Sequence, residues 1–190
     1  DEILEVLPPV EPLRLTLDTG VWMVSVEHLV PALTRGARIR RGVRIEEVLL
    51  DQATLSDLIV LGPGPEPATL EEALGVPMVR AVRAGEAFRV GWETWGLGGR
   101  DEAFAYTLTV VEEGGGVVDR IAGWLGLGGD DVVSDLTWSE EAPAMLGAHF
   151  RSVEVTLPDQ LEAGRYLLRL ELRSQGREPL RSERSVRVER

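Results

Sequence analysis

Cysteine is absent from this chain of 190 residues, and histidine occurs only as His28 and His149. The absence of cysteine excludes a disulfide framework, a thiolate nucleophile and a thiolate metal site. A catalytic triad needs a histidine held between a nucleophile and an acid, and the chain contains no Gly-x-Ser-x-Gly elbow. The sequence therefore predicts a protein that is not an enzyme, and a small hydrolase is the least favoured alternative.

Lysine is also absent, so all 20 basic residues are arginine, against 32 acidic residues and a net charge of -12. This balance argues against nucleic-acid binding, which needs a basic face. Glycine-rich loops at 96–99, 114–116 and 126–129 lack the Walker and dinucleotide fingerprints, so we expect no cofactor. We also expect no bound metal, and interpret Asp130 and Asp131 as an acidic turn, with a calcium site as the alternative.

No apolar run approaches the roughly 18 residues that a membrane-spanning helix needs. The best candidate, residues 21–30, is interrupted by Glu27 and His28. We therefore expect contact with a membrane only indirectly, through partners. The chain begins with Asp1 rather than methionine, and we expect a periplasmic or otherwise exported protein from which any signal peptide has been removed.

Alternation of apolar and polar residues, the period of a half-buried strand, is the main pattern that is present. It is clearest near the end of the chain, where Tyr166, Leu168, Leu170 and Leu172 share one face. Tyr166 follows Gly164 at the start of this segment, as in a tyrosine corner. We therefore predict a buried Tyr166 whose hydroxyl bonds to backbone within residues 157–164.

Other alternating segments recur every 10–15 residues, as in a sandwich rather than in βαβ units. The only helical signal is a capping box from Thr69 to Glu72, which predicts about one turn over 70–74. The predicted fold is all-β: an immunoglobulin-like antiparallel β-sandwich with an additional N-terminal β region and one short helical turn. The expected strands after the helix cover residues 88–92, 104–110, 117–122, 132–138, 150–157, 164–173 and 185–189.

Three regions are expected along the chain. Residues 1–62 form the N-terminal β region, a hairpin plus an arginine-rich segment, with the hairpin formed by residues 13–17 and 21–26 around Asp18-Thr19-Gly20. Residues 31–44 could contain a short helical turn, and residues 45–50 and 55–61 are expected to be extended. Residues 63–85 form a linker with the short helix, after the break at 62–67, and residues 86–190 form the sandwich.

Several short motifs, taken in order, resemble the C-terminal β-sandwich region of exported bacterial proteins of the GWxTD-domain-associated kind. The resemblance covers residues 55–190 and implies an envelope location without known catalytic residues. The chain departs from the GWxTD motif itself, because Gly91-Trp92-Glu93-Thr94 is followed by Trp95 instead of aspartate. The motifs that carry the resemblance are Leu55-Ser-Asp-Leu58, Thr69-Leu-Glu-Glu-Ala-Leu74, Gly91-Trp-Glu-Thr-Trp-Gly-Leu97, Ile121-Ala-Gly-Trp-Leu-Gly-Leu127, Leu136-Thr-Trp138 and the Leu161 to Tyr166 corner.

Two features suggest contacts with partners. Trp95 lies on the strand face opposite Trp92, beside polar residues, where an exposed aromatic suits a protein interface or a carbohydrate platform. A basic segment stands out in the acidic chain and could bind an acidic partner or anionic headgroups through bidentate contacts. Its members are Arg35, Arg38, Arg40, Arg41 and Arg44. The alternatives are an edge-capping Trp95 and a solvated arginine loop.

The sequence thus predicts a non-enzymatic accessory subunit that binds protein subunits of a larger complex. We expect it on the periplasmic side of an envelope or membrane-bound assembly. One concrete version is an extrinsic stabilising subunit of a photosynthetic reaction-centre–antenna complex. The alternative is a carbohydrate-binding β-sandwich module that uses exposed tryptophan.

Overall fold

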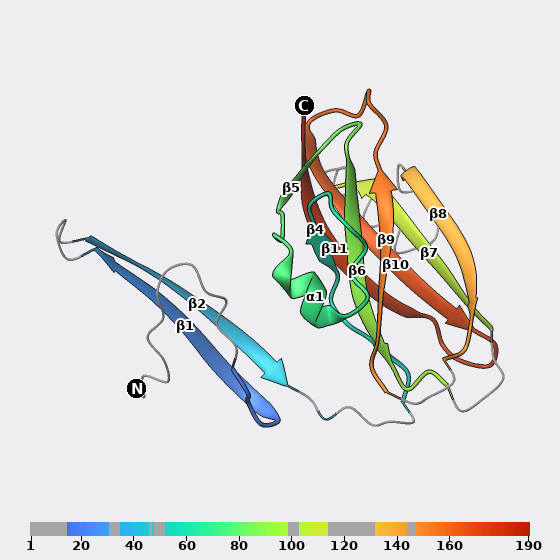
Figure 1. The fold of residues 1–190 in the computed structure, drawn as a ribbon, viewed down its shortest axis with the longest axis horizontal. Helices are drawn as coiled ribbons and strands as arrows, with labels where there is room; N and C mark the ends of the chain where they lie inside the picture. The colour runs from blue at the N-terminus through green and yellow to red at the C-terminus, as the bar shows by residue number, and fades with distance from the viewer. Residues whose placement is uncertain are drawn as a thin grey trace, which may run out of the picture. The chain divides into compact units, whose positions relative to one another are not determined.

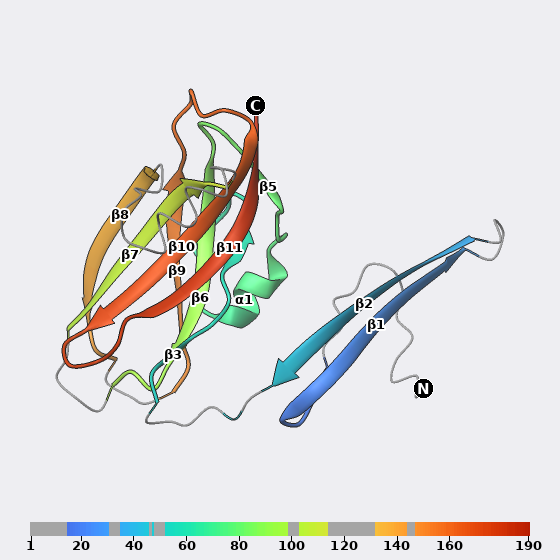
Figure 2. The same cartoon turned by 180° about the vertical axis from the view of Figure 1, so that it is seen from behind.

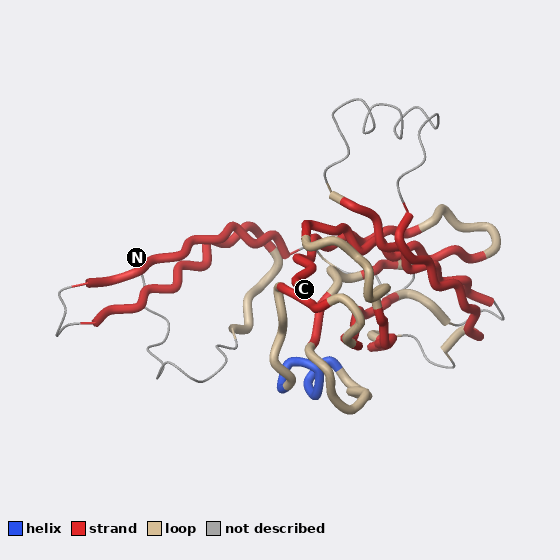
Figure 3. Tube along the Cα trace, turned by 90° about the horizontal axis from the view of Figure 1, so that it is seen from above, coloured by secondary structure: helices blue, strands red, loops and turns tan. Residues whose placement is uncertain are grey.

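The computed structural model describes residues 15–30, 35–45, 47, 52–98, 103–113, 132–143 and 147–190. The chain divides into two compact units, Asp1–Glu47 and Val48–Arg190, and each is described by itself. Strands make up most of the described structure, with one short helix and loops between them (Figure 3). No described helix has the length and apolarity that crossing a bilayer would require.

The second unit is a sandwich of two sheets, which Figures 1 and 2 show from opposite sides. One sheet has the order β5-β11-β10-β7-β8; in the other, β3 and β4 pair with β6, which also pairs with β9. All of these pairs are antiparallel except β5 with β11, which is parallel. The five-stranded sheet comprises β5 (Ala81–Arg83), β11 (Leu180–Glu189), β10 (Gly164–Ser174), β7 (Ala103–Glu112) and β8 (Val132–Glu141), and the second sheet β3 (Thr54–Leu55), β4 (Ile59–Leu61), β6 (Ala87–Trp95) and β9 (His149–Thr156).

Alternate residues of both sheets fill the space between the layers, as the two-residue period requires. The predicted face of β6, with Phe88, Val90 and Trp92, is buried, and so is every second residue of β7 and β10. The predicted all-β sandwich is therefore confirmed, and its core is built from the faces that the sequence pattern assigned to it.

Two local predictions are confirmed in detail. Tyr166 is 1% exposed, and its hydroxyl donates to the Glu162 carbonyl oxygen at 3.0 Å, so the tyrosine corner forms. The helix α1 (Leu70–Gly75) begins at Thr69, whose hydroxyl accepts from the Glu72 backbone N–H at 3.2 Å. The Glu72 carboxylate accepts in turn from the Ala68 backbone N–H at 2.8 Å, which completes a capping interaction.

The sandwich unit begins earlier in the chain than the sequence analysis placed it. The division falls between Glu47 and Val48, whereas the sequence prediction put the linker at residues 63–85. Strands β3 and β4 pair with β6, and β5 pairs with β11, so segments on both sides of the 62–67 break belong to the sheets. The segment 55–61, which was expected to be extended, contains the end of β3 and all of β4, two short strands that pair with β6 at different points.

The first unit is a two-stranded antiparallel ribbon of β1 (Gly20–Val30) and β2 (Arg35–Ile45) (Figure 1). The predicted hairpin between residues 13–17 and 21–26 is therefore wrong. The described residues 15–17 form no strand, and β1 pairs forward in the chain with β2 over its full length. The pairing with β2 is favoured because β2 offers 11 residues of continuous ladder, more than the predicted five-residue segment 13–17 could provide.

The suggested helical turn within residues 31–44 is also wrong from Arg35 onward, where the chain is extended. Polar and apolar residues alternate across Ala37 to Arg40, and this period favours a strand once a partner strand is present. The predicted strand at 117–122 and the segment with Trp124, Asp130 and Asp131 lie outside the described residues.

Candidate protein-binding surfaces

The arginine-rich segment forms strand β2 of the ribbon and is not a loop. Arg35 begins the strand opposite Val30, and Arg44 lies opposite Val21 near its end. Arg38 and Glu27 are cross-strand partners, and Arg38 Nε lies 2.6 Å from Glu27 Oε1. Both side chains are about half exposed, so this ion pair contributes little to folding stability.

The arginines of β2 are divided between the two faces of the ribbon. Arg38, Arg40 and Arg44 occupy alternate positions on one face, and Arg41 lies on the other face opposite Val24. All four are exposed. The ribbon therefore presents guanidinium groups on both of its faces.

The same ribbon carries most of the exposed apolar surface. Five of the eight large hydrophobic residues that are exposed in the described part of the chain belong to β1 and β2. The exposed fractions reach 76% for Val21 and 70% for Ile39. The other three ribbon residues of this set are Trp22, Met23 and Val26. These residues divide between the two faces of the ribbon: Val21 and Met23 lie on one face, and Trp22, Val26 and Ile39 on the other. Exposed apolar surface gathered on one element favours an interaction with a partner.

Trp95 is separate from the arginines. It ends β6 in the sandwich unit, opposite Thr54 of β3, and is half-buried. Gly96 follows with φ of 65°, and a side chain there would clash with the backbone of Gln52, so this corner packs closely. The six residues predicted as contact candidates thus lie in two different units, five on the ribbon and one at the sandwich edge.

A cluster of three aromatic rings joins the two sheets of the sandwich. Trp92 of β6 packs against Tyr106 of β7 and Trp138 of β8, with ring centroids 5.7 and 5.8 Å away, and Tyr106 stacks on Trp138 at 5.2 Å. Such contacts add to the free energy gained by burying the rings. The cluster lies next to β8 and β9, the edge strands of the two described sheets.

An ion pair crosses between these edge strands. Arg151 of β9 donates from Nε to Glu140 Oε2 of β8 at 2.7 Å, and Trp138 Nε1 donates to Glu140 Oε1 at 3.0 Å. Beside the pair is a small cavity of about 210 Å³, lined by Trp92, Leu136, Trp138, Glu140, Ser152 and Val153. The Glu140 carboxylate thus links the two sheets at this edge of the sandwich, because it accepts hydrogen bonds from side chains of both β8 and β9.

Burial, and next the nearby Glu140 carboxylate, raise the pKa of the Tyr106 hydroxyl to about 12. The Arg151 guanidinium and contacts from Thr94 and Trp92 oppose this shift, although Trp92 Nε1 reaches no acceptor at hydrogen-bond distance. A phenol with so high a pKa stays protonated at neutral pH and cannot serve as a general base. The cluster therefore has the properties of a packed core element.

The two histidines that the sequence analysis weighed belong to different units. His28 is on the ribbon, and His149 begins β9 with its carbonyl accepting from the Thr94 hydroxyl. Burial raises the pKa of Glu93. Within the described ranges, no three His, Cys, Asp or Glu side chains are grouped to hold a metal ion.

The sequence analysis missed the aromatic cluster, although each ring falls in phase with its own strand. The rings come from three different strands, and only the register places Tyr106 opposite Trp138. Periodicity indicates which face a residue occupies, whereas pairing between distant strands decides its neighbours.

Comparison with known proteins adds no family. No protein-family model matches the chain, and no curated protein matches it either.

Proposed function

We propose that this protein is a non-enzymatic accessory subunit that binds other proteins of a larger assembly, with the β1–β2 ribbon as its docking element. The observation that carries the proposal is the combination of exposed apolar residues and arginines on a two-stranded ribbon. Following the resemblance to exported proteins, we assign it to the periplasmic side of an envelope or membrane-bound complex. An extrinsic stabilising subunit of a photosynthetic reaction-centre–antenna complex is one such role.

The stability of an isolated ribbon supports this proposal. A two-stranded sheet is marginal in water, because neither face is covered and both edges leave backbone groups unpaired. Among the described residues, β1 and β2 pair only with each other, and Val21, Met23 and Ile39 are each more than two-thirds exposed. A partner that covers these side chains would stabilise the ribbon through apolar burial.

The charge of the ribbon favours an acidic protein partner. Strands β1 and β2 contain five arginines and one acidic residue, Glu27, in a chain of net charge -12. Anionic lipid headgroups could pair with the same guanidiniums. A lipid acyl region, however, offers no hydrogen bonds to the edges of a ribbon, whereas a protein strand does. A protein surface therefore fits both the side chains and the backbone.

The proposal is tested by co-purification of the full chain from native membranes over a salt series. We expect wild-type protein to remain with a complex at low salt. Changing Arg38, Arg40 and Arg41 together to Gln should release it at lower salt, with an unchanged melting temperature, because exposed charges contribute little to folding. A second variant, Val26→Ser with Ile39→Ser, should release it at all salt concentrations, because apolar contacts are not screened.

A matched control changes three exposed arginines of the sandwich, Arg83, Arg173 and Arg181, to Gln. This variant has the same net charge as the ribbon variant and should be retained like wild type. Retention of both ribbon variants at the wild-type level would contradict the docking role. Binding of wild-type protein to a glycan column, and not to any complex, would instead support the carbohydrate-binding alternative.

A further inference from the structure

Two arginines face each other across the outer face of the five-stranded sheet. Arg165 of β10 is the direct cross-strand partner of Arg187 of β11. Their neighbours Tyr166, Val186 and Val188 are buried in the core, so the alternation of the strands places Arg165 and Arg187 outside. Like charges directly opposite in an antiparallel pair destabilise the sheet.

Elsewhere on this face, the same two strands pair opposite charges. Arg169 lies opposite Glu183, with 2.7 Å between Arg169 Nε and Glu183 Oε1. Glu171 lies opposite Arg181, with 2.6 Å between Arg181 Nε and Glu171 Oε2. Burial raises the pKa of the Glu171 carboxyl, but its contacts with arginines outweigh burial and lower the pKa overall. The Arg165–Arg187 pair is therefore a local departure from a face that otherwise balances its charges.

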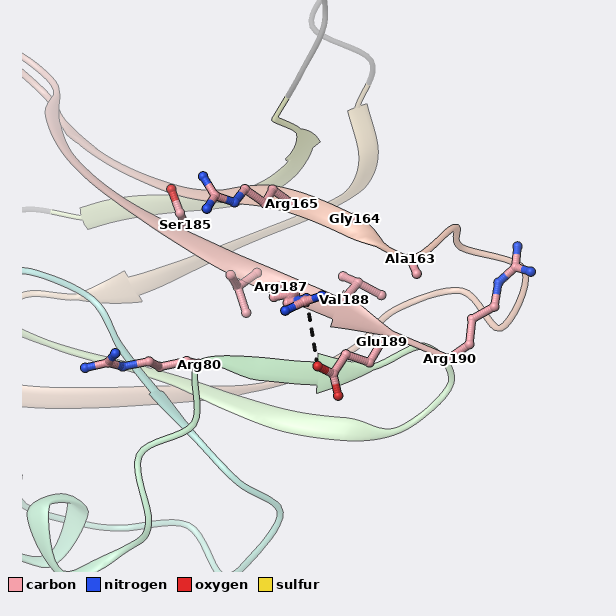
Figure 4. A pocket seen from close by; sticks show the side chains of 10 residues that line it. Arg80, Ala163, Gly164, Arg165, Ser185, Arg187, Val188, Glu189 and Arg190 are labelled. Atoms are coloured by element: carbon pink, nitrogen blue, oxygen red, sulfur yellow. Dashed lines mark ion pairs between the residues drawn. The ribbon is translucent and has the colours of Figure 1, made fainter.

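The pair lines a shallow groove of about 890 Å³ that also contains Arg80 and Arg190 (Figure 4). Within the groove, the Glu189 carboxylate contacts Arg187, with 3.9 Å between Glu189 Oε1 and Arg187 Nε. Arg80, Arg165 and Arg190 are exposed, and none of them makes an ion pair with another described residue. Four guanidiniums thus line one groove with a single weak carboxylate contact.

This concentration of positive charge is opposed to the charge of its unit. Residues 48–190 contain 14 arginines and 24 acidic residues, a net charge of -10. Non-specific electrostatics therefore repel a polyanion from the sandwich, and only a local site can bind one. A groove lined by arginines on a unit of negative net charge favours a negatively charged ligand.

We propose that this groove binds an acidic, extended segment of a partner protein. Each guanidinium can hold a carboxylate through two parallel hydrogen bonds. The arginines are exposed: Arg165 lies in β10, Arg187 in β11, and Arg80 and Arg190 directly before β5 and after β11. A spread of this kind suits carboxylates spaced along a peptide. A single small anion would need enclosure by buried donors, which this groove does not provide. The site is separate from the ribbon and does not depend on its docking role.

The test measures binding of a fluorescent oligoglutamate peptide by anisotropy at low salt. The full chain is used, with Arg38, Arg40 and Arg41 changed to Gln so that the ribbon cannot supply the binding site. In this background we expect saturable binding, which Arg165→Gln with Arg187→Gln weakens by about tenfold or more. The matched control, Arg169→Gln with Arg181→Gln, removes the same charge from the same face and strands and should weaken binding less than about twofold.

A second variant separates binding from folding. Arg187→Glu replaces the like-charge pair with an opposite-charge pair, so the melting temperature should stay the same or rise while peptide binding is lost. Absence of peptide binding, or equal loss in the Arg165/Arg187 variant and its control, would overturn the proposal. Binding of inorganic phosphate that competes with the peptide at equal affinity would also overturn it, in favour of a small-anion site.

Discussion

At the scale of single residues, the chemistry of the sandwich is concentrated around Tyr106. Its ring stacks on Trp138 and packs on Trp92, and its hydroxyl lies where burial and the Glu140 carboxylate disfavour ionisation. The raised pKa is a consequence of packing. It makes the free energy of unfolding of the sandwich depend on pH in the alkaline range.

We expect the free energy of unfolding to fall as the pH rises from 10 toward 12. The folded pKa of Tyr106 is about 12, whereas tyrosine in an unfolded chain titrates near 10. In this window the unfolded state releases the proton first, so ionisation favours unfolding, by about 1 kcal/mol between pH 10 and 11. Urea unfolding at a series of pH values measures this loss.

Tyr106→Phe provides the control, because it keeps the ring and removes the titrating hydroxyl. Its stability should depend less steeply on pH in the same window, although burial also raises the pKa of Tyr166. Identical slopes for the variant and the wild type would mean that Tyr106 does not resist ionisation in the folded protein.

At the scale of elements, the predictions that held rest on local sequence signals. The Thr69 cap and the Tyr166 corner each bond within four residues, so the residues that specify them are adjacent in the chain. The ribbon was mispredicted because the choice between residues 13–17 and β2 as the partner of β1 depends on how long a ladder each can form. Its arginines were identified from composition alone, while the groove around Arg165 and Arg187 depends on register, which periodicity does not give.

The helix α1 offers a local test of capping. Thr69→Ala removes the acceptor for the Glu72 backbone N–H and should lower the free energy of unfolding by about 1 kcal/mol. Thr69→Ser keeps a hydroxyl at the same place and should stay near wild type. Denaturant unfolding compares the three proteins, and equal losses for Ala and Ser would argue that the methyl group of Thr69, and not its hydroxyl, supports the helix.

At the scale of the whole molecule, the two units differ in how they are stabilised. The described residues of the sandwich core, from Ala53 to Val188, all follow Glu47 in the chain. The sequence placed the boundary too late, because the proline and glycine break at 62–67 resembles a linker while it is a loop between β4 and α1.

A fragment of residues 48–190 should therefore fold alone, with a melting temperature within about 2 °C of the full chain, because it contains all of the described core residues. Circular dichroism of the fragment and the full chain, recorded together, measures this. A fragment that is unfolded, or that melts many degrees lower, would show that the first unit supports the sandwich.

The position of β11 has a consequence for the order of events during synthesis. This strand lies between β5 and β10 and brings Val186 and Val188 into the core, yet it is made after every other strand of its sheet. Until residues 180–189 leave the ribosome, β5 has no neighbour in the sheet and β10 has one bare side. The nascent sheet thus stays incomplete until this last of its strands has been made, a state that chaperones can engage before β11 closes it.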